Sequence, residues 1–195
     1  MPSTYTTNLG IEKIGSGEQS GTWDVTTNLN FDIIDQGING AVSVTLPATG
    51  SSGSPNVIDI TDGTLSDGRN KFIEFVDGGD LGGTAYVQLT PNDAEKIVFM
   101  RNSLSGSRSI LVFQGTYNAA NDFEVPAGKD VVIRFDGGGA GATVTDVFTS
   151  LLVTEFEATN AAATRTNLGL GTAATADSTD FDPAGEAVAL AIALG

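Results

Sequence analysis

The feature that most constrains the fold is a succession of short alternating segments within residues 41–153. Apolar side chains take every second position in Ala41–Leu46 and again in Lys71–Val76, which is the pattern of strands that bury one face. Turn residues such as Pro47 and Gly128 separate the segments. Strands at intervals of roughly 10 residues are typical of an all-β domain. The sequence therefore predicts a sandwich or barrel of short antiparallel strands, with further strands at 57–60, 85–90, 95–100, 109–113, 122–125, 130–135 and 143–148.

Residues 1–40 predict a Gly-rich extended arm followed by one short helix. Between Thr27 and Ile38, the apolar residues Leu29, Ile33 and Ile34 recur at helical spacing. Thr26 or Thr27 is the expected N-cap, and Gly37 with Asn39–Gly40 is expected to end the helix. The lone Trp23 is expected to pack the arm onto the domain.

Residues 154–195 differ in composition from the strands before them. This segment is rich in Ala, Thr and Gly and holds few bulky side chains, among them Phe156, Leu168 and Leu170. Such a stretch has too little apolar surface to fold as an isolated monomer, but several copies wound around one axis share their few large residues. We therefore expect a trimeric stem in which Leu168 and Leu170 face the symmetry axis. A disordered tail is the alternative that composition alone leaves open.

Charge and residue usage restrict the possible partners and chemistry. The chain of 195 residues has 24 acidic and 9 basic residues, a formal net charge of −15, and neither His nor Cys. Such a balance argues against nucleic acid and against an anionic membrane as partners, and no apolar run is long enough to span a bilayer. Disulfides and thiolate metal sites are excluded, as is catalysis by a Ser–His or Cys–His pair. The amino terminus lacks the features of a signal peptide, so synthesis in a host cytoplasm is expected.

Two stretches resemble proteins of bacteriophage tails. The run Thr164–Ala176, with its Asn-Leu-Gly-Leu-Gly core, is similar to the linker repeat of phage tail fibres. Residues 8–150 resemble, in collinear order, a β-rich module of phage tail proteins. The matching pieces are Gly10–Lys13, Gly17–Trp23, Asn30–Asp35, Ser66–Asn70 and Val125–Lys129.

The resemblance implies a structural virion protein, a tail fibre or tail-associated protein involved in host attachment. The expected partners are further copies in a homotrimer, other tail or baseplate proteins, and a host-surface glycan or protein. Residues 1–40 are expected to attach the protein to the virion through Trp23, Phe31, Ile33 and Ile34. A capsid decoration or head fibre protein is the first alternative, and a polysaccharide depolymerase tailspike is the second.

Carboxylates are the only side chains in this sequence that are candidates for catalysis or metal binding. A glycosidase needs two of them at close range, and Asp32/Asp35, Asp77/Asp80 and Asp180/Asp182 are near each other in sequence. The loops at Asp59–Gly63 and Asp77–Asp80 offer oxygen ligands for calcium, although neither matches an EF-hand. Because most of these acids stand beside Gly in turns, we expect them to shape turns, and we expect no enzymatic activity, metal or cofactor. Asp67 is expected to pair with Arg69 in a tight turn, and Tyr86 and Tyr117 are expected to pack rather than to bind sugars.

Overall fold

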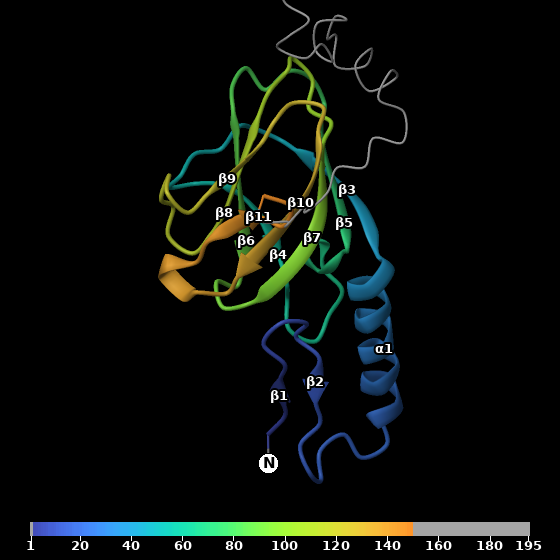
Figure 1. Cartoon of the computed structure of the whole chain (residues 1–195). Helices are drawn as coiled ribbons and strands as arrows, with labels where there is room; N and C mark the ends of the chain where they lie inside the picture. Colours follow the sequence, from blue (N-terminus) through green and yellow to red (C-terminus); the bar gives the residue numbers. More distant parts are fainter. Residues whose placement is uncertain (1, 150–195) are drawn as a thin grey trace, which may run out of the picture. The chain divides into compact units, whose positions relative to one another are not determined.

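The computed structural model describes residues 2–149, which belong to one compact unit (Figure 1). A β-hairpin, β1 (Thr4–Tyr5) and β2 (Glu12–Lys13), and a single α-helix, α1 (Trp23–Asn39), precede the main sheets. The remaining strands are β3 (Ala41–Leu46), β4 (Asn56–Asp59), β5 (Phe72–Asp77), β6 (Ala85–Thr90), β7 (Glu95–Asn102), β8 (Ile110–Gln114), β9 (Phe123–Val125), β10 (Asp130–Asp136) and β11 (Val144–Asp146). Two 3₁₀ turns, η1 (Asp67–Arg69) and η2 (Gly139–Gly141), lie in the loops. The predicted stem, with Phe156, Leu168 and Leu170, lies outside the described residues.

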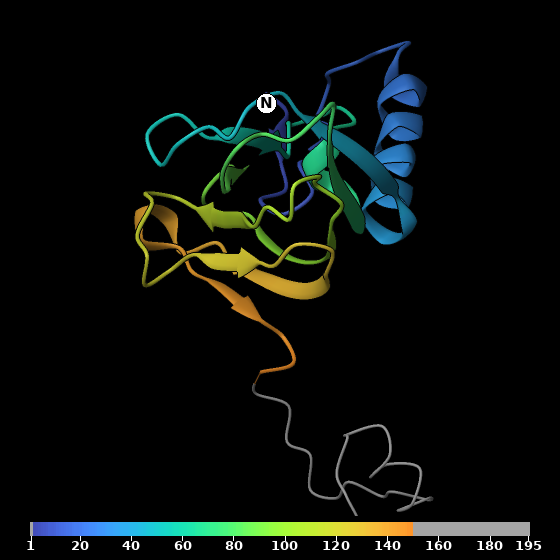
Figure 2. The same cartoon turned by 90° about the horizontal axis from the view of Figure 1, so that it is seen from above.

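The strands form two sheets that pack face to face (Figures 1 and 2). The five-stranded sheet has the order β11-β10-β7-β5-β3, and the four-stranded sheet has the order β4-β6-β8-β9. From β3 to β8 the chain crosses to the opposite sheet after every strand. Each strand from β5 to β8 therefore lies beside the previous strand of its own sheet and runs parallel to it.

The expectation of antiparallel strands is wrong for half of this fold. The pairs β3–β5, β5–β7, β4–β6 and β6–β8 are parallel, while β7–β10, β10–β11 and β8–β9 are antiparallel. A strand that pairs in parallel needs a long crossover, and here the strand in the opposite sheet forms part of it. The sandwich prediction holds at the coarser level of two β-sheets with one helix, and the two sheets do not close into a barrel.

The core lies between the two sheets and comes from the inward residues of each strand. Along β7, buried residues alternate with exposed or half-buried ones, and Val98 and Met100 point inward. Phe75 and Ile133 from the same sheet meet Val87 of the opposite sheet in one cluster of buried side chains. Burial of this apolar area supplies the main force that holds the sheets together.

Helix α1 is longer than the sequence pattern indicates. It begins at Trp23, four residues before Thr27, and Thr22 occupies the N-cap position without a side-chain cap bond. Gly37 lies inside the helix, and Gly40 is the C-cap, its N–H bonded to the carbonyl of Gln36. The helix then leads directly into β3.

The amino-terminal arm forms a hairpin rather than an extended strap. The pairing of β1 with β2 joins Thr4 to Lys13 and Tyr5 to Glu12. Gly10, in the loop of this hairpin, has a φ of +56°, and a Cβ there would lie 2.8 Å from the guanidinium of Arg69. A residue without a side chain is therefore required where the hairpin meets the domain.

Candidate functional site

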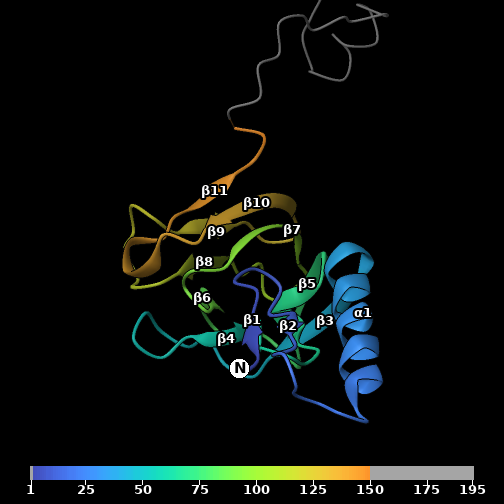
Figure 3. The ribbon, with the colours of Figure 1, turned by 90° about the horizontal axis from the view of Figure 1, so that it is seen from below.

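Helix α1 carries an apolar surface that no described residue covers. Trp23, Phe31 and Ile38 are 61%, 62% and 59% exposed, although large aromatic and branched side chains normally lie inside. Figure 3 shows the helix at the periphery of the described residues, beside β3 and the hairpin. These exposed side chains make α1 a candidate interaction site.

The four expected attachment residues fall on different sides of this helix. Trp23 and Phe31 are exposed, and Ile34 is half-buried. Ile33 is fully buried, so it packs inside the protein and offers no surface to a partner. The helical spacing correctly placed Phe31, Ile33 and Ile34 on one helix, but it did not show which of them the hairpin covers. The expectation that Trp23 packs the arm onto the domain is wrong, because Trp23 is the first residue of α1 and is 61% exposed.

The hairpin and the η1 loop cover one side of α1. The Asn30 side chain accepts a hydrogen bond from the Glu12 N–H at 3.0 Å and donates one to the Glu12 carbonyl at 2.9 Å. The Ser66 N–H donates to Gln36 Oε1 at 3.3 Å. These contacts fix the helix against the domain by one side only.

The outer face of the five-stranded sheet is a second partly apolar surface. Phe99 is 44% exposed, and the register places it between Val132 of β10 and Phe72 of β5. Arg101 lies 5.5 Å from the centre of the Phe72 ring, and Lys71 lies 5.7 Å from that of Phe99. These cations cover the rings in part. The sequence feature that could have indicated this surface is the run Ile97–Met100, which is apolar on both faces of its strand.

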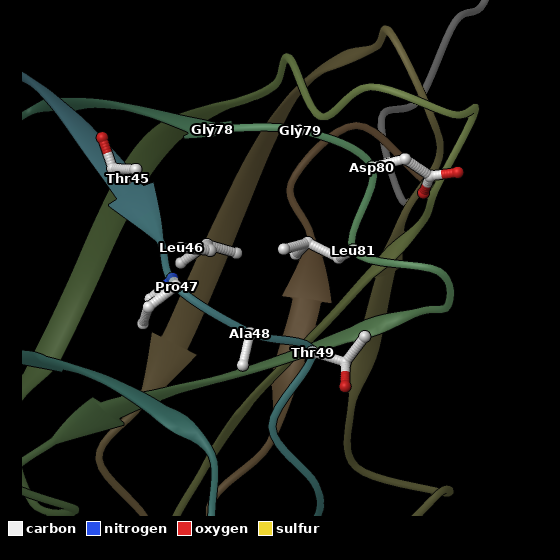
Figure 4. Close-up of a pocket in the computed structure, with 9 residues that line it drawn as sticks. All are labelled: Thr45, Leu46, Pro47, Ala48, Thr49, Gly78, Gly79, Asp80 and Leu81. Carbon is white, nitrogen blue, oxygen red and sulfur yellow. The ribbon is translucent and has the colours of Figure 1, made fainter.

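A hollow of about 620 Å³ opens between the β3–β4 loop and the β5–β6 loop (Figure 4). Leu46 and Leu81 point toward each other across it, while the carboxylate of Asp80 points away. Asp80 receives hydrogen bonds from Arg108 at 2.7 and 2.9 Å, and these bonds hold its pKa at about 2. A carboxylate held ionised in this way cannot serve as a general acid at neutral pH, so this hollow lacks the acid of a hydrolase.

The other acidic loops use their carboxylates within the protein. Asp77 accepts hydrogen bonds from the N–H and hydroxyl of Ser105, both at 3.1 Å, and Asp59 accepts one from Thr90. Among residues 2–149, no group of three or more acids is close enough to hold a metal ion. Asp180 and Asp182 lie outside the described residues.

Arg69 forms a buried cation centre that the sequence did not predict. The turn at Ser66–Asn70 is present as η1, but the side chain of Arg69 is fully buried and does not pair with Asp67. It donates to the carbonyls of Thr64, at 2.8 Å, and Thr61, and its Nη1 has no hydrogen-bond partner among the described residues. Burial lowers the pKa of Arg69, and the carboxylate of Asp62 opposes that shift. This cation holds the loop between β4 and β5 together around η1.

Lys96 lies beside this centre and is also held within the fold. Its Nζ donates to the Arg69 carbonyl at 2.7 Å. Burial, with smaller effects from Lys71 and Arg69, lowers the pKa of Lys96 to about 8. No carboxylate within residues 2–149 bonds to this amine, so the described arrangement contains no acid–base pair.

The two tyrosines considered as sugar contacts pack against each other. The ring centres of Tyr86 and Tyr117 are 5.6 Å apart in an edge-on arrangement, and Tyr117 meets Phe113 in the same way at 5.3 Å. Both tyrosines are half-buried. They form a small aromatic cluster on the four-stranded sheet.

Comparisons with protein-family models, with curated proteins and with solved structures find no match to this chain. Within residues 2–149, α1 is the single α-helix, and it is neither long nor apolar enough to cross a membrane.

Proposed function

We propose that this protein is a non-enzymatic structural protein of a tailed bacteriophage virion, a tail fibre or tail-associated fibre that takes part in host attachment. It assembles as a homotrimer and docks on other tail or baseplate proteins through residues 1–40. The proposal rests on the resemblance of residues 8–150 and 164–176 to phage tail sequences. The observation that carries it furthest is the exposed apolar surface of α1, within the segment expected to attach the protein.

The chemistry of the described residues supports a structural role. Asp80, Asp130 and Asp136 are tied to arginine or threonine side chains. For Asp136, burial acts to raise the pKa, but hydrogen bonds from Thr143 and Gly138 outweigh it and leave the pKa below its usual value. A hydrolytic site needs one carboxyl kept protonated near a second that is ionised, and the shifts at these three acids run the opposite way.

Immunogold labelling of intact particles tests the location. Antibodies against the purified protein are expected to label the tail of phage particles that encode it. Labelling of the head would replace the proposal with the capsid decoration alternative. Particles that carry no label, despite synthesis of the protein during infection, would contradict a virion role.

Incubation with host capsule or lipopolysaccharide separates a fibre from a depolymerase. No reducing ends are expected to appear, and binding without cleavage agrees with host attachment. Release of oligosaccharide that stops when a single Asp or Glu is replaced would show a depolymerase instead.

A further inference from the structure

An apolar row crosses the outer face of the five-stranded sheet. The register places Val132 of β10, Phe99 of β7 and Phe72 of β5 side by side, and the N–H of Val147, just after β11, donates to the Val132 carbonyl at 2.9 Å. We call these four residues the outer band. Phe99 and Val147 are 44% and 37% exposed, and Val132 and Phe72 are half-buried. Helix α1 lies beside β3 at one end of this sheet, and no described element covers β7 and β10 on this side (Figures 2 and 3).

One side of the outer band is acidic. Asp130, Arg101 and Glu74 are neighbours across β10, β7 and β5. Arg101 forms an ion pair with Asp130 at 2.7 Å, and the hydroxyl of Ser103 donates to Glu74 at 2.6 Å. Two acids and one base give this side a net charge of −1.

The opposite side of the outer band is basic. Arg134 lies beside Ile97 in the register of β10 and β7, and Lys71 donates to the Ile97 carbonyl at 3.4 Å. Glu95, further from the band, lies 3.8 Å from Arg134. Two bases and one acid give this side a net charge of +1. The band is therefore an apolar centre between rims of opposite charge, in a chain whose net charge is −15.

This face is complementary to itself about one two-fold axis. An axis that runs along the outer band, between two facing sheets, lays each band on the other and exchanges the acidic and basic sides. Glu74 of one copy then faces Lys71 of the other, because both residues lie at β5. Asp130 faces Arg134, because both lie on β10. An axis parallel to the strands would instead bring Asp130 over Glu74, and like charges oppose contact.

The same charges indicate that the occupant is a second copy of this chain. Copies of a strongly acidic chain repel each other over most of their surface. Across the outer band, the side of net charge −1 meets the side of net charge +1, so the charges at this contact attract. Two sheets that pack face to face keep their strands within about 30° of each other, which keeps the opposite rims in register.

We propose that the outer band is a two-fold self-association surface, on which the five-stranded sheets of two copies of this chain pack face to face. Apolar side chains fill the centre of this contact and charged side chains its rim, which is the usual arrangement of a protein interface. The inference goes beyond the proposed function, because the predicted stem joins copies around a three-fold axis. A chain that uses both contacts assembles as two trimers joined through their outer bands.

Sedimentation of the purified full-length chain tests the contact with a matched pair of variants. Phe99→Ser is expected to raise the dissociation constant of the two-fold contact at least about 100-fold, because one ring in each copy loses its burial. Val57→Ser is the control, since Val57 is 52% exposed on the other sheet, and it should leave the dissociation constant unchanged. An association that Phe99→Ser leaves intact would overturn the outer band.

Charge reversal tests the direction of the two-fold axis. Glu74→Lys and Lys71→Glu each bring like charges together when a variant pairs with itself, and each is expected to raise the dissociation constant at least about 10-fold. A mixture of the two variants restores both pairs of opposite charge, so the mixed assembly is expected to form more tightly than either variant alone. Circular dichroism checks that both variants are folded. A mixture that associates no better than its components would contradict the proposal.

The number of copies in the wild-type assembly separates this inference from the proposed function. Two copies, or six where the stem also associates, agree with the outer band. Three copies would retain a homotrimer held by the stem and overturn the outer band. A monomer at micromolar concentration would overturn both. None of these results touches the tail location, which the labelling of particles decides.

Discussion

At the scale of single residues, polar side chains inside the domain fix its loops. Asn102 is fully buried and donates to the carbonyls of Arg108 and Val125 at 2.8 and 3.0 Å. Gln114 donates to the carbonyls of Pro91 and Ala94, both at 2.9 Å. Buried polar groups are tolerated when they are hydrogen-bonded, and they then hold the backbone in one arrangement.

Replacement of the buried Arg69 should lower the stability of the fold. Arg69→Met is expected to lower the free energy of unfolding by about 3 kcal/mol, because the carbonyls of Thr61 and Thr64 lose their donor. Urea denaturation followed by circular dichroism measures this loss. Arg101→Met removes an exposed cation paired with Asp130 and should cost far less. Equal losses in the two variants would contradict the structural importance of Arg69.

Lys96 should make stability depend on pH in the alkaline range. Its pKa is about 8 in the folded chain against 10.5 as the ordinary value. Between these values the unfolded chain binds more protons than the folded chain, so the free energy of unfolding rises as the pH increases from about 8 to about 10. Lys96→Met is expected to flatten this rise, whereas Lys129→Met, at an exposed lysine, should leave it. An unchanged rise in Lys96→Met would assign the effect to another group.

At the scale of secondary-structure elements, the sequence predicted that α1 exists but misplaced its start. The spacing of Leu29, Ile33, Ile34 and Ile38 indicated a helix, and α1 is present, but it starts at Trp23. Thr22 occupies the N-cap position, and because Thr26 and Thr27 are the same residue type, residue identity alone did not fix the start of the helix. The apolar residues of α1 occupy more than one side of the helix, and only the packing of the hairpin shows which side is covered.

Ile33 should report on the contact between the hairpin and α1. Ile33→Ala is expected to lower the free energy of unfolding by about 2–4 kcal/mol, because it leaves a cavity at a fully buried site. Val25→Ala, at a side chain that is 63% exposed on the same helix, should change it by less than about 0.5 kcal/mol. Denaturation curves for both variants test the difference. A Val25→Ala loss as large as that of Ile33→Ala would show that α1 is covered on both sides.

At the scale of the whole molecule, self-association around a three-fold axis is expected to come from the stem predicted at residues 154–195. Replacing both Leu168 and Leu170 by Ser is expected to weaken the trimer without unfolding residues 41–153, because these are the largest apolar residues in their stretch. Sedimentation measures the first effect, and circular dichroism during thermal unfolding measures the second. Unchanged trimer stability in the double variant would count against an axial position for these leucines.

The sequence by itself determined where most strands lie and which of their side chains face inward. The segments 41–46 and 85–90 match β3 and β6 in their bounds, because alternation with a period of two is a local property of a half-buried strand. Residues 97–100 are apolar on both faces of β7, so there only the structure shows that Val98 and Met100 point inward. Turn residues at the ends of these segments gave the remaining boundaries to within a few positions.

Only the tertiary structure decided which strands pair and in which direction. Alternation is identical in parallel and antiparallel strands, so β3, β5 and β7 carry no local sign of their parallel arrangement. That arrangement follows from the passage of the chain between two sheets, which depends on contacts far apart in sequence. The burial of Arg69 and the exposure of Trp23, Phe31 and Ile38 on α1 likewise depend on contacts that are far apart in sequence. Each depends on where the hairpin and the η1 loop come to rest, and no spacing within the sequence encodes that position.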